Sequence, residues 1–320
     1  MKYFVKKLIY FFIPIVILAI PTDFIISYIL KQSHLSSGEF EVWNDIFQGN
    51  IKANIAIMGS SRAVVQFNTK ILERNLRLNV YNFGMNGNRF HIQYFRHLQY
   101  LKYNIKPENL IISLDVFEFQ TKRNFYYPQQ FLPYMLWNRD MFDNLSKYDN
   151  FKKIDFFIPL IRFYDFKRHI RDAVNEIIKR KSKKYRYKGF NARNFSWNND
   201  LQNAKKKMKE YVVKIDTTTF NLFNNFITDC QNNRIKVILV YSPEYIEGQQ
   251  FVTNRKEIMK IYKNLALKHN LELLDYSDCD ISYNKDFFYN SNHLNSKGAD
   301  LFTRKLVEDL KSKNLLVRKN

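Results

Sequence analysis

Two side chains of this 320-residue chain could together perform nucleophilic chemistry, Ser61 and His293. Ser61 lies in the run Gly-Ser-Ser-Arg at positions 59–62, and His293 lies in Asn-Ser-Asn-His-Leu-Asn at positions 290–295. A serine hydroxyl becomes a nucleophile when a base removes its proton, and the reaction needs N–H donors where negative charge develops. The backbone N–H groups of Ser61, at a turn, and of Gly87, which has no side chain, could supply them. The pattern predicts a serine–histidine site.

Polar side chains in neighbouring loops are expected to contact a substrate, namely Arg62, Asn86, Asn88 and Glu244. No metal or other cofactor is expected. Cys230 and Cys279 are the only cysteines and do not have the Cys-x-x-Cys spacing of a metal site. Two free thiols are one expectation, and a single bridge in an oxidising compartment is the other.

The elements that must position these residues alternate between short apolar runs and helical stretches, as in a parallel sheet covered on both faces. Strands are predicted at 54–59, 78–82, 109–115, 236–241 and 271–276, and helices at 69–76, 91–103, 201–232, 254–268 and 296–311. In open parallel sheets, ligands bind at the carboxyl ends of the strands. Ser61, the loop containing Gly87 and His293 should therefore meet at one edge of the sheet.

The interval from about 120 to 200 interrupts this alternation and is interpreted as an insertion. Its segment from Lys179 to Arg193 is strongly basic, and aromatic residues interleave with or follow the charges. Such a segment could stack on sugars or bases, lie against anionic lipid, or form a solvated loop.

The N-terminus carries a targeting signal. Lysines at positions 2, 6 and 7 precede an apolar stretch from Leu8 to Leu30. As a helix this stretch would be about 34 Å long, enough to cross a bilayer core. The lysines favour a cytoplasmic N-terminus with the remainder outside. A cleaved signal peptide is the main alternative, although Ala-Ile-Pro-Thr offers no small-x-small cleavage site.

The formal net charge of +21 is compatible with polyanion binding, and equally with a solvated basic surface. A nucleic acid partner is not expected for an exported domain.

Taken together, the runs at 59–62, 82–87 and 290–299 resemble the SGNH/GDSL hydrolase superfamily, over roughly Ala53 to Leu310 without the insertion. The resemblance implies a three-layer α/β/α, flavodoxin-like fold with a parallel five-stranded sheet. It implies residues 1–30 as a membrane anchor, 31–52 as a linker and 53–320 as the SGNH-like domain.

The resemblance also implies roles for individual residues. Ser61 is then the nucleophile, His293 the general base, and the N–H groups of Ser61 and Gly87 the oxyanion donors. The layout is similar to that of bacterial proteins that move or remove O-acyl groups on cell-surface polymers, often beside a membrane-bound O-acyltransferase. The implied substrate is an acylated polysaccharide or other cell-surface glycan.

Two positions depart from the family pattern. Phe117 stands where a further oxyanion-donating Asn is usual, and Asn290 stands where an Asp precedes the histidine. An Asn can orient an imidazole but carries no charge to stabilise imidazolium. The site then works as a dyad, uses another carboxylate such as Asp286 or Glu244, or belongs to a catalytically degenerate module that binds a polysaccharide or membrane partner.

Overall fold

The structure is a computed structural model that describes residues 2–179 and 184–317. It divides into two compact units, one comprising Met1–Asn44 and Arg123–Tyr185 and the other comprising Asp45–Lys122 and Arg186–Asn320. The insertion expected at about 120–200 thus corresponds to Arg123–Tyr185 of the first unit and to the beginning of Arg186–Asn320 of the second unit. Positions 180–183 of the basic run lie outside the described residues.

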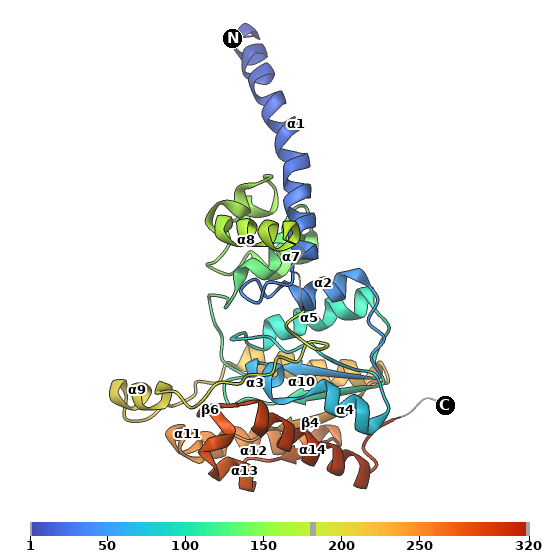
Figure 1. Ribbon diagram of the computed structural model, residues 1–320, viewed down its shortest axis with the longest axis vertical. Coiled ribbons are helices and arrows are strands. Elements are labelled where there is room, and N and C mark those ends of the chain that lie inside the picture. The colour runs from blue at the N-terminus through green and yellow to red at the C-terminus, as the bar shows by residue number, and fades with distance from the viewer. Residues whose placement is uncertain (1, 180–183, 318–320) are drawn as a thin grey trace. The chain divides into compact units, whose positions relative to one another are not determined.

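The second unit is built on a parallel five-stranded sheet with the order β2-β1-β3-β4-β5. Helices lie on either side of it (Figure 1). The strands are β1 (Ile55–Gly59), β2 (Val80–Asn82), β3 (Asn109–Ser113), β4 (Lys236–Tyr241) and β5 (Glu272–Asp275). All five fall within the predicted ranges, and the predicted fold class is confirmed.

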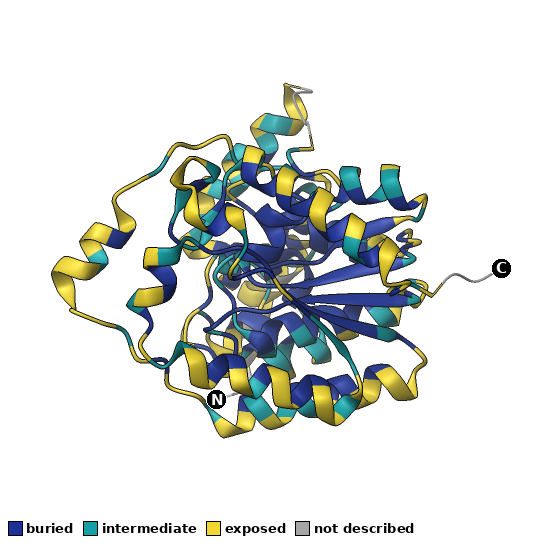
Figure 2. Cartoon of the chain, turned by 90° about the horizontal axis from the view of Figure 1, so that it is seen from below, coloured by how far each residue is buried: buried dark blue, intermediate teal, exposed yellow. Residues whose placement is uncertain are grey.

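Helices cover both faces of this sheet, which explains why its strands are runs of apolar residues without alternation. On one face, β1, β3, β4 and β5 share a buried core with α3 (Ser61–Gln66), α4 (Thr69–Leu76) and α14 (Ser296–Ser312). The other face is covered by α5 (Phe90–Tyr103), α10 (Thr217–Asn232) and α12 (Arg255–His269). The strands are buried between these layers (Figure 2).

The remaining elements of the second unit are short. They are α9 (Asp200–Lys207), α11 (Ile246–Phe251), α13 (Asp280–Tyr283), η4 (Lys285–Phe287), β6 (Phe288–Asn290) and β7 (His293–Leu294). The single helix predicted over 201–232 was wrong, because residues 208–216 separate α9 from α10. This segment is extended: Tyr211 bridges to Val252, and the side chain of Asp216 caps α10 by accepting from the Thr219 N–H at 2.7 Å.

The strand order places a switch point between β1 and β3. After β1 the chain crosses to β2 on one side, and it returns to β3 on the other side of β1. The crossovers diverge there, and ligands of open parallel sheets bind at such a point, at the carboxyl ends of the strands. Ser61 follows the carboxyl end of β1 directly.

Helix α1 (Lys2–Gln32) of the first unit is long and apolar enough to cross a membrane, over Tyr10–Gln32. It is followed by α2 (Phe40–Gln48), so the residues expected to form a linker contain a helix that extends from the first unit into the second. The insertion part of the first unit contains η1 (Pro128–Phe131), α6 (Leu132–Met135), α7 (Arg139–Leu145), η2 (Lys153–Phe156), η3 (Ile161–Phe166) and α8 (Lys167–Ile178).

Both cysteines belong to the second unit and are free thiols. Cys230 is buried on α10 and Cys279 precedes α13. The disulfide that the sequence left open is therefore not formed.

Candidate active site

The turn between β1 and α3 holds Ser61 at the first residue of a helix. Gly59 adopts φ 151°, and a Cβ there would lie 2.7 Å from the Ser113 carbonyl oxygen, so this position favours glycine. Ser60 caps α3 by accepting from the Arg62 N–H at 3.4 Å. The N–H of Ser61 lies in the first helical turn, where it has no partner within the helix.

His293 meets Ser61 although 232 residues separate them. The Ser61 Oγ lies 2.7 Å from the Nε2 of His293. The imidazole is carried by the antiparallel hairpin β6–β7, and the Tyr289 ring stacks on it with centroids 5.3 Å apart and planes inclined by 8°. The structure thus brings together the two residues predicted to carry the chemistry.

Asn290 orients the imidazole through its carbonyl oxygen. Its Oδ1 lies 2.8 Å from the Nδ1 of His293 and accepts from the Asn292 N–H at 3.1 Å. An amide oxygen can only accept, so the Nδ1 of His293 carries the proton and Nε2 presents its lone pair to Ser61. This is the tautomer that a general base requires.

The carboxylate of Asp200, at the start of α9, contacts the side-chain nitrogen of Asn290. The Nδ2 of Asn290 donates to its Oδ2 at 3.4 Å, and the Nδ2 of Asn198 donates to the same oxygen at 2.8 Å. Sequence reasoning missed Asp200 because it lies 90 residues from Asn290. The signal available was that it is the first acidic residue after Glu176 in a basic stretch.

Of the two carboxylates considered from the sequence, that of Glu244 is engaged elsewhere. The Oε2 of Glu244 accepts from the Tyr241 hydroxyl at 2.6 Å and lies 3.7 Å from the Nη1 of Arg62. Asp286 lies in η4, and its backbone carbonyl accepts from the Asn295 side chain at 2.7 Å.

Burial lowers the pKa of His293 to about 4, with the attraction of Asp115 opposing and the repulsion of Arg62 adding to the effect. The imidazole is therefore neutral at physiological pH and able to accept a proton.

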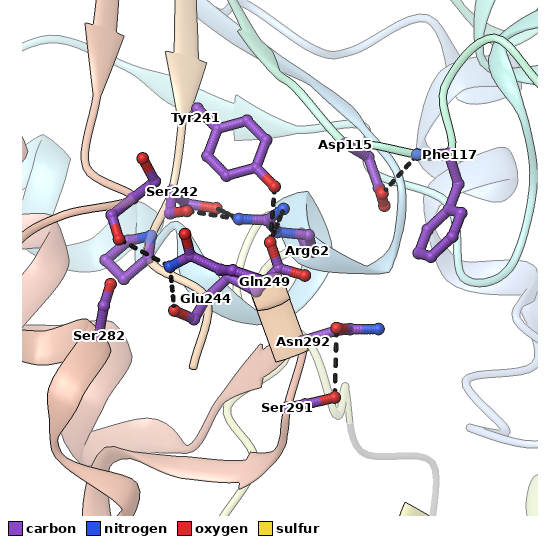
Figure 3. A network of polar contacts seen from close by, with 12 residues as sticks. Arg62, Asp115, Phe117, Tyr241, Ser242, Glu244, Gln249, Ser282, Ser291 and Asn292 are labelled. Carbon is purple, nitrogen blue, oxygen red and sulfur yellow. Dashed lines mark hydrogen bonds and ion pairs between the residues drawn. The ribbon is translucent and has the colours of Figure 1, made fainter. Parts of the chain in front are cut away.

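Arg62 and Glu244, expected to bind substrate, both lie in the interior with side chains 2% and 1% exposed. The Nη2 of Arg62 donates to the backbone carbonyl of Ser242, and its guanidinium lies 4.4 Å from the centre of the Tyr241 ring (Figure 3). The contacts of Arg62 and Glu244 join α3 to the loop after β4. Both side chains therefore stabilise the fold next to the candidate site.

Asn86, Gly87 and Asn88 lie in the loop after β2. The Met85 N–H donates to the Gly59 carbonyl at 2.9 Å, which ties this loop to the turn that carries Ser61. Gly87 has φ 66°, a left-handed conformation that glycine tolerates best. Asn88 is buried, and its Nδ2 donates to the Asn86 carbonyl at 3.0 Å, whereas Asn86 and Gly87 are partly exposed.

The loop after β3 contains Asp115 and Phe117. Asp115 accepts from the Ser60 hydroxyl at 2.8 Å. It also accepts from the Phe117 N–H at 3.0 Å (Figure 3). Burial would raise the pKa of Asp115, but Arg62, Arg89 and these two hydrogen bonds outweigh burial and lower it. Phe117 packs its ring against Tyr211 and the guanidinium of Arg89, so it offers no amide donor in the place of the family's Asn.

Part of the basic-aromatic segment is used within the fold. The Lys188 carbonyl accepts from the Asn82 N–H at 2.9 Å, and both Lys188 and the Tyr187 hydroxyl bond to Glu73. Gly189 has φ 82°, and a Cβ there would collide with the Asn82 carbonyl. These residues therefore lie against β2 at the edge of the sheet.

Residues 194–197, which come after this segment in the chain, line a pocket of about 490 Å³ next to the hairpin that carries His293. Its walls include Phe195, Trp197, Lys285 and Asp286, together with Asn194, Ser196, Phe288, Asn295, Ser296 and Lys297. The Phe195 ring meets Tyr289 edge-on at 5.9 Å, so only the Tyr289 ring separates it from the imidazole.

No family model matches the sequence, and no curated protein matches it. Among solved structures, the chain is similar to a protein of the G-D-S-L lipolytic family from Desulfitobacterium hafniense, with 12% identity and a TM-score of 0.37 over 80% of this chain and 99% of that one. It is also similar to a protein described as an acylhydrolase from Bacteroides fragilis, with 11% identity and a TM-score of 0.33 over 81% and 88% of the two chains.

A third similar structure is a GDSL-like lipase from Bacteroides thetaiotaomicron, with 9% identity and a TM-score of 0.31 over 86% of this chain and 99% of that one. The chain is thus structurally similar, at low identity, to GDSL-type lipolytic and acylhydrolase proteins.

Proposed function

We propose that the chain is a serine ester hydrolase or O-acyltransferase. The observation that carries the proposal is the contact of the Ser61 Oγ with an imidazole whose other nitrogen is held by Asn290 Oδ1. A hydroxyl, a neutral base and an acceptor that fixes the tautomer are the parts that nucleophilic acyl transfer requires.

In the proposed reaction, Ser61 Oγ attacks the ester carbonyl carbon while His293 Nε2 takes the hydroxyl proton. The N–H groups of Ser61 and Gly87 stabilise the negative oxygen. His293 then returns the proton to the departing alcohol oxygen as its bond to carbon breaks. Water or a sugar hydroxyl then attacks the acyl-serine and loses its proton to His293. His293 returns this proton to Ser61 Oγ as the bond between Oγ and the acyl carbon breaks, which releases the acid or a new ester.

We propose that the substrates are O-acyl, most simply O-acetyl, esters of a cell-surface glycan. The pocket beside the hairpin supports this class, because the exposed ring of Phe195 could stack on a sugar face. In the transfer direction, a membrane-bound O-acyltransferase would be the partner that delivers acyl groups.

We also propose that α1 anchors the protein, with its N-terminus cytoplasmic and the second unit outside. The length and apolar composition of Tyr10–Gln32 support an anchor. Arg162 binds Asp23 of the same unit through two hydrogen bonds of 2.6 Å, so the part of α1 after the Ala-Ile-Pro-Thr region belongs to the folded unit.

A serine-directed fluorophosphonate tests the proposed nucleophile. Wild type and Ser60→Ala should be labelled, and Ser61→Ala should not. Equal labelling of wild type and Ser61→Ala would show that Ser61 is not the nucleophile. An unlabelled wild type that still binds glycan would favour the degenerate binding module, which the neutral Asn290 also suggests.

The pH dependence of kcat/KM for an acetyl ester should be flat from pH 7 to about 5 and fall below that. His293 acts as a base only when neutral, and its pKa is lowered to about 4. The kcat/KM profile reports groups of the free enzyme. An acid limb centred near the ordinary histidine pKa of about 6.5 would contradict this expectation.

Circular dichroism should accompany this measurement. Burial also lowers the pKa of His97 to about 4. Below about pH 6.5 these histidines bind protons in the unfolded chain but not in the folded chain. The free energy of unfolding therefore falls as the pH drops from about 6.5 towards 4. Loss of rate at constant ellipticity separates titration of the site from unfolding.

A further inference from the structure

The first unit exposes a cluster of large apolar side chains around the last third of α1. We define the apolar face as Phe24, Trp137, Phe157, Ile158 and Ile161, which are between 40% and 56% exposed. The Trp137 ring lies 6.2 Å from that of Phe24, and its Nε1 donates to the Phe157 carbonyl at 3.0 Å. Side chains of this size gathered in one place favour contact with an apolar partner.

The apolar face lies at the level of one acidic residue of α1, Asp23. Its carboxylate accepts from the Leu160 N–H at 2.7 Å and pairs with Arg162, and the Arg162 Nη2 also donates to Ser27 at 2.9 Å. Asp23 and Arg162 are each 1% exposed. The insertion is therefore fastened to α1 at Asp23, and it leaves Phe24 and Ile25 on the open side of the helix.

The length of α1 places this level within a bilayer if α1 is an anchor. From Leu8 to Thr22 there are 15 residues between Lys7 and Asp23. As a helix they extend about 22 Å, which is shorter than a hydrocarbon core of about 30 Å. A complete crossing that begins at Leu8 needs about 20 residues and ends near Ser27. Asp23 and the residues fastened to it then enter the outer leaflet.

We infer that the apolar face is seated in the outer leaflet of a phospholipid bilayer, so that the insertion is a membrane-embedded collar on α1. This inference rests on the proposed anchor. The Asp23–Arg162 pair suits that place, because acids at membrane depth are found paired and turned away from lipid. Trp137 suits it as well, since tryptophan favours the membrane interface. The exposed Lys152 and Lys153 next to η2 would meet lipid phosphates.

Bromolipid quenching of tryptophan fluorescence tests the collar. The full chain is reconstituted in vesicles of phosphatidylcholine and phosphatidylglycerol, with and without bromine at carbons 6 and 7 of the acyl chains. Wild type should lose fluorescence in brominated vesicles, Trp137→Phe should lose this quenching, and Trp197→Phe should retain it. Trp43, which is buried, remains in all three proteins.

Flotation of the vesicles separates the collar from the anchor. Wild type that floats but is quenched no more than Trp137→Phe overturns the collar and leaves the anchor standing. That result would indicate instead that the apolar face binds a transmembrane helix of another protein. Wild type that does not float overturns the anchor and the collar together.

A separate observation concerns the active site. The Asn290 amide has its oxygen toward His293 and the Asn292 N–H and its nitrogen toward the Asp200 carboxylate. A carboxylate accepts hydrogen bonds only, so Asp200 disfavours the flipped amide, which would turn N–H groups toward the imidazole. In a serine protease, replacement of the triad Asp by Asn lowers turnover about 10⁴-fold through the wrong tautomer.

We infer that Asp200 is a positioning residue that keeps Asn290 in the productive orientation. Its own carboxylate is held by Asn198, whose backbone N–H donates to the Tyr289 carbonyl at 2.9 Å. Asp200, at the start of α9 in the second unit, thus contributes the negative charge that the sequence lacks at position 290. This inference rests on the proposed ester hydrolysis.

A double-mutant cycle tests Asp200. In wild type, Asp200→Ala should lower kcat about tenfold, as when one hydrogen bond to a charged group is lost. In the Asn290→Asp background the same change should leave kcat unchanged or raise it, because two adjacent carboxylates repel. A merely structural residue would lower kcat in both backgrounds. Asp229→Ala, on the exposed surface of α10, is the charge-matched control.

The outcomes separate this inference from the proposed reaction. Asp200→Ala with wild-type kcat, beside an inactive Ser61→Ala, overturns the positioning role alone. Equal losses in both backgrounds also overturn it. Full activity of Ser61→Ala overturns the proposed reaction itself.

Discussion

Replacing His293 with alanine is expected to lower kcat for an acetyl ester by about 10³-fold, which is within the range for loss of a general base. Without the imidazole, no group takes the Ser61 proton, although the backbone N–H groups of Ser61 and Gly87 remain to stabilise the negative oxygen. The residual rate should equal that of Ser61→Ala, because the two residues act as a unit. Hydrolysis of p-nitrophenyl acetate measures the effect.

His269→Ala is the matched control for this experiment. His269 ends α12 and bonds to the Asn224 side chain at 2.9 Å, so its removal deletes an imidazole outside the site. It should leave kcat within about twofold, as expected for a surface substitution with a small effect on stability. Equal activities of His293→Ala and His269→Ala would refute the assignment of the base.

Arg62→Met should lower the free energy of unfolding by about 3–5 kcal/mol, as expected when one partner of a buried ion pair is removed. The methionine leaves Glu244 buried with the Tyr241 hydroxyl but without its cation. It also leaves the Ser242 carbonyl without its guanidinium donor. Urea unfolding followed by circular dichroism measures the change.

The double variant Arg62→Met/Glu244→Gln should recover part of this loss, because the second change removes the unpaired charge. Lys205→Met is the control, since Lys205 and Glu247 form an ion pair whose side chains are 44% and 49% exposed. Its cost should be below about 1 kcal/mol. Equal costs for Arg62→Met and Lys205→Met would show that the buried pair contributes no more than a surface pair.

The sequence was sufficient for the sheet and for the position of the central residues. Each strand is a short run of apolar residues, a pattern that burial on both faces requires and that can be recognised locally. In an open parallel sheet the loops after the strands share one edge. This rule placed Ser61 and His293 together across 232 residues without a contact being known.

Only the tertiary structure decided how the other polar residues are used. Arg62 seemed available to a substrate, yet it is buried against Ser242 and Glu244. Asp200 was not singled out in the sequence, yet its carboxylate faces Asn290. A side chain's partner depends on segments that fold back from distant parts of the chain, and local pattern carries little information about them.

The first unit illustrates the same limit. Residues 1–30 were recognisable as an apolar helix, because length and composition are local properties. That Asp23 pairs with Arg162, 139 residues away, depends on the packing of the insertion against α1. The sequence by itself therefore determined the five strands and the sheet edge, and it predicted that Ser61 and His293 meet there. The tertiary structure decided which charges are buried together, because burial is a property of the assembled fold.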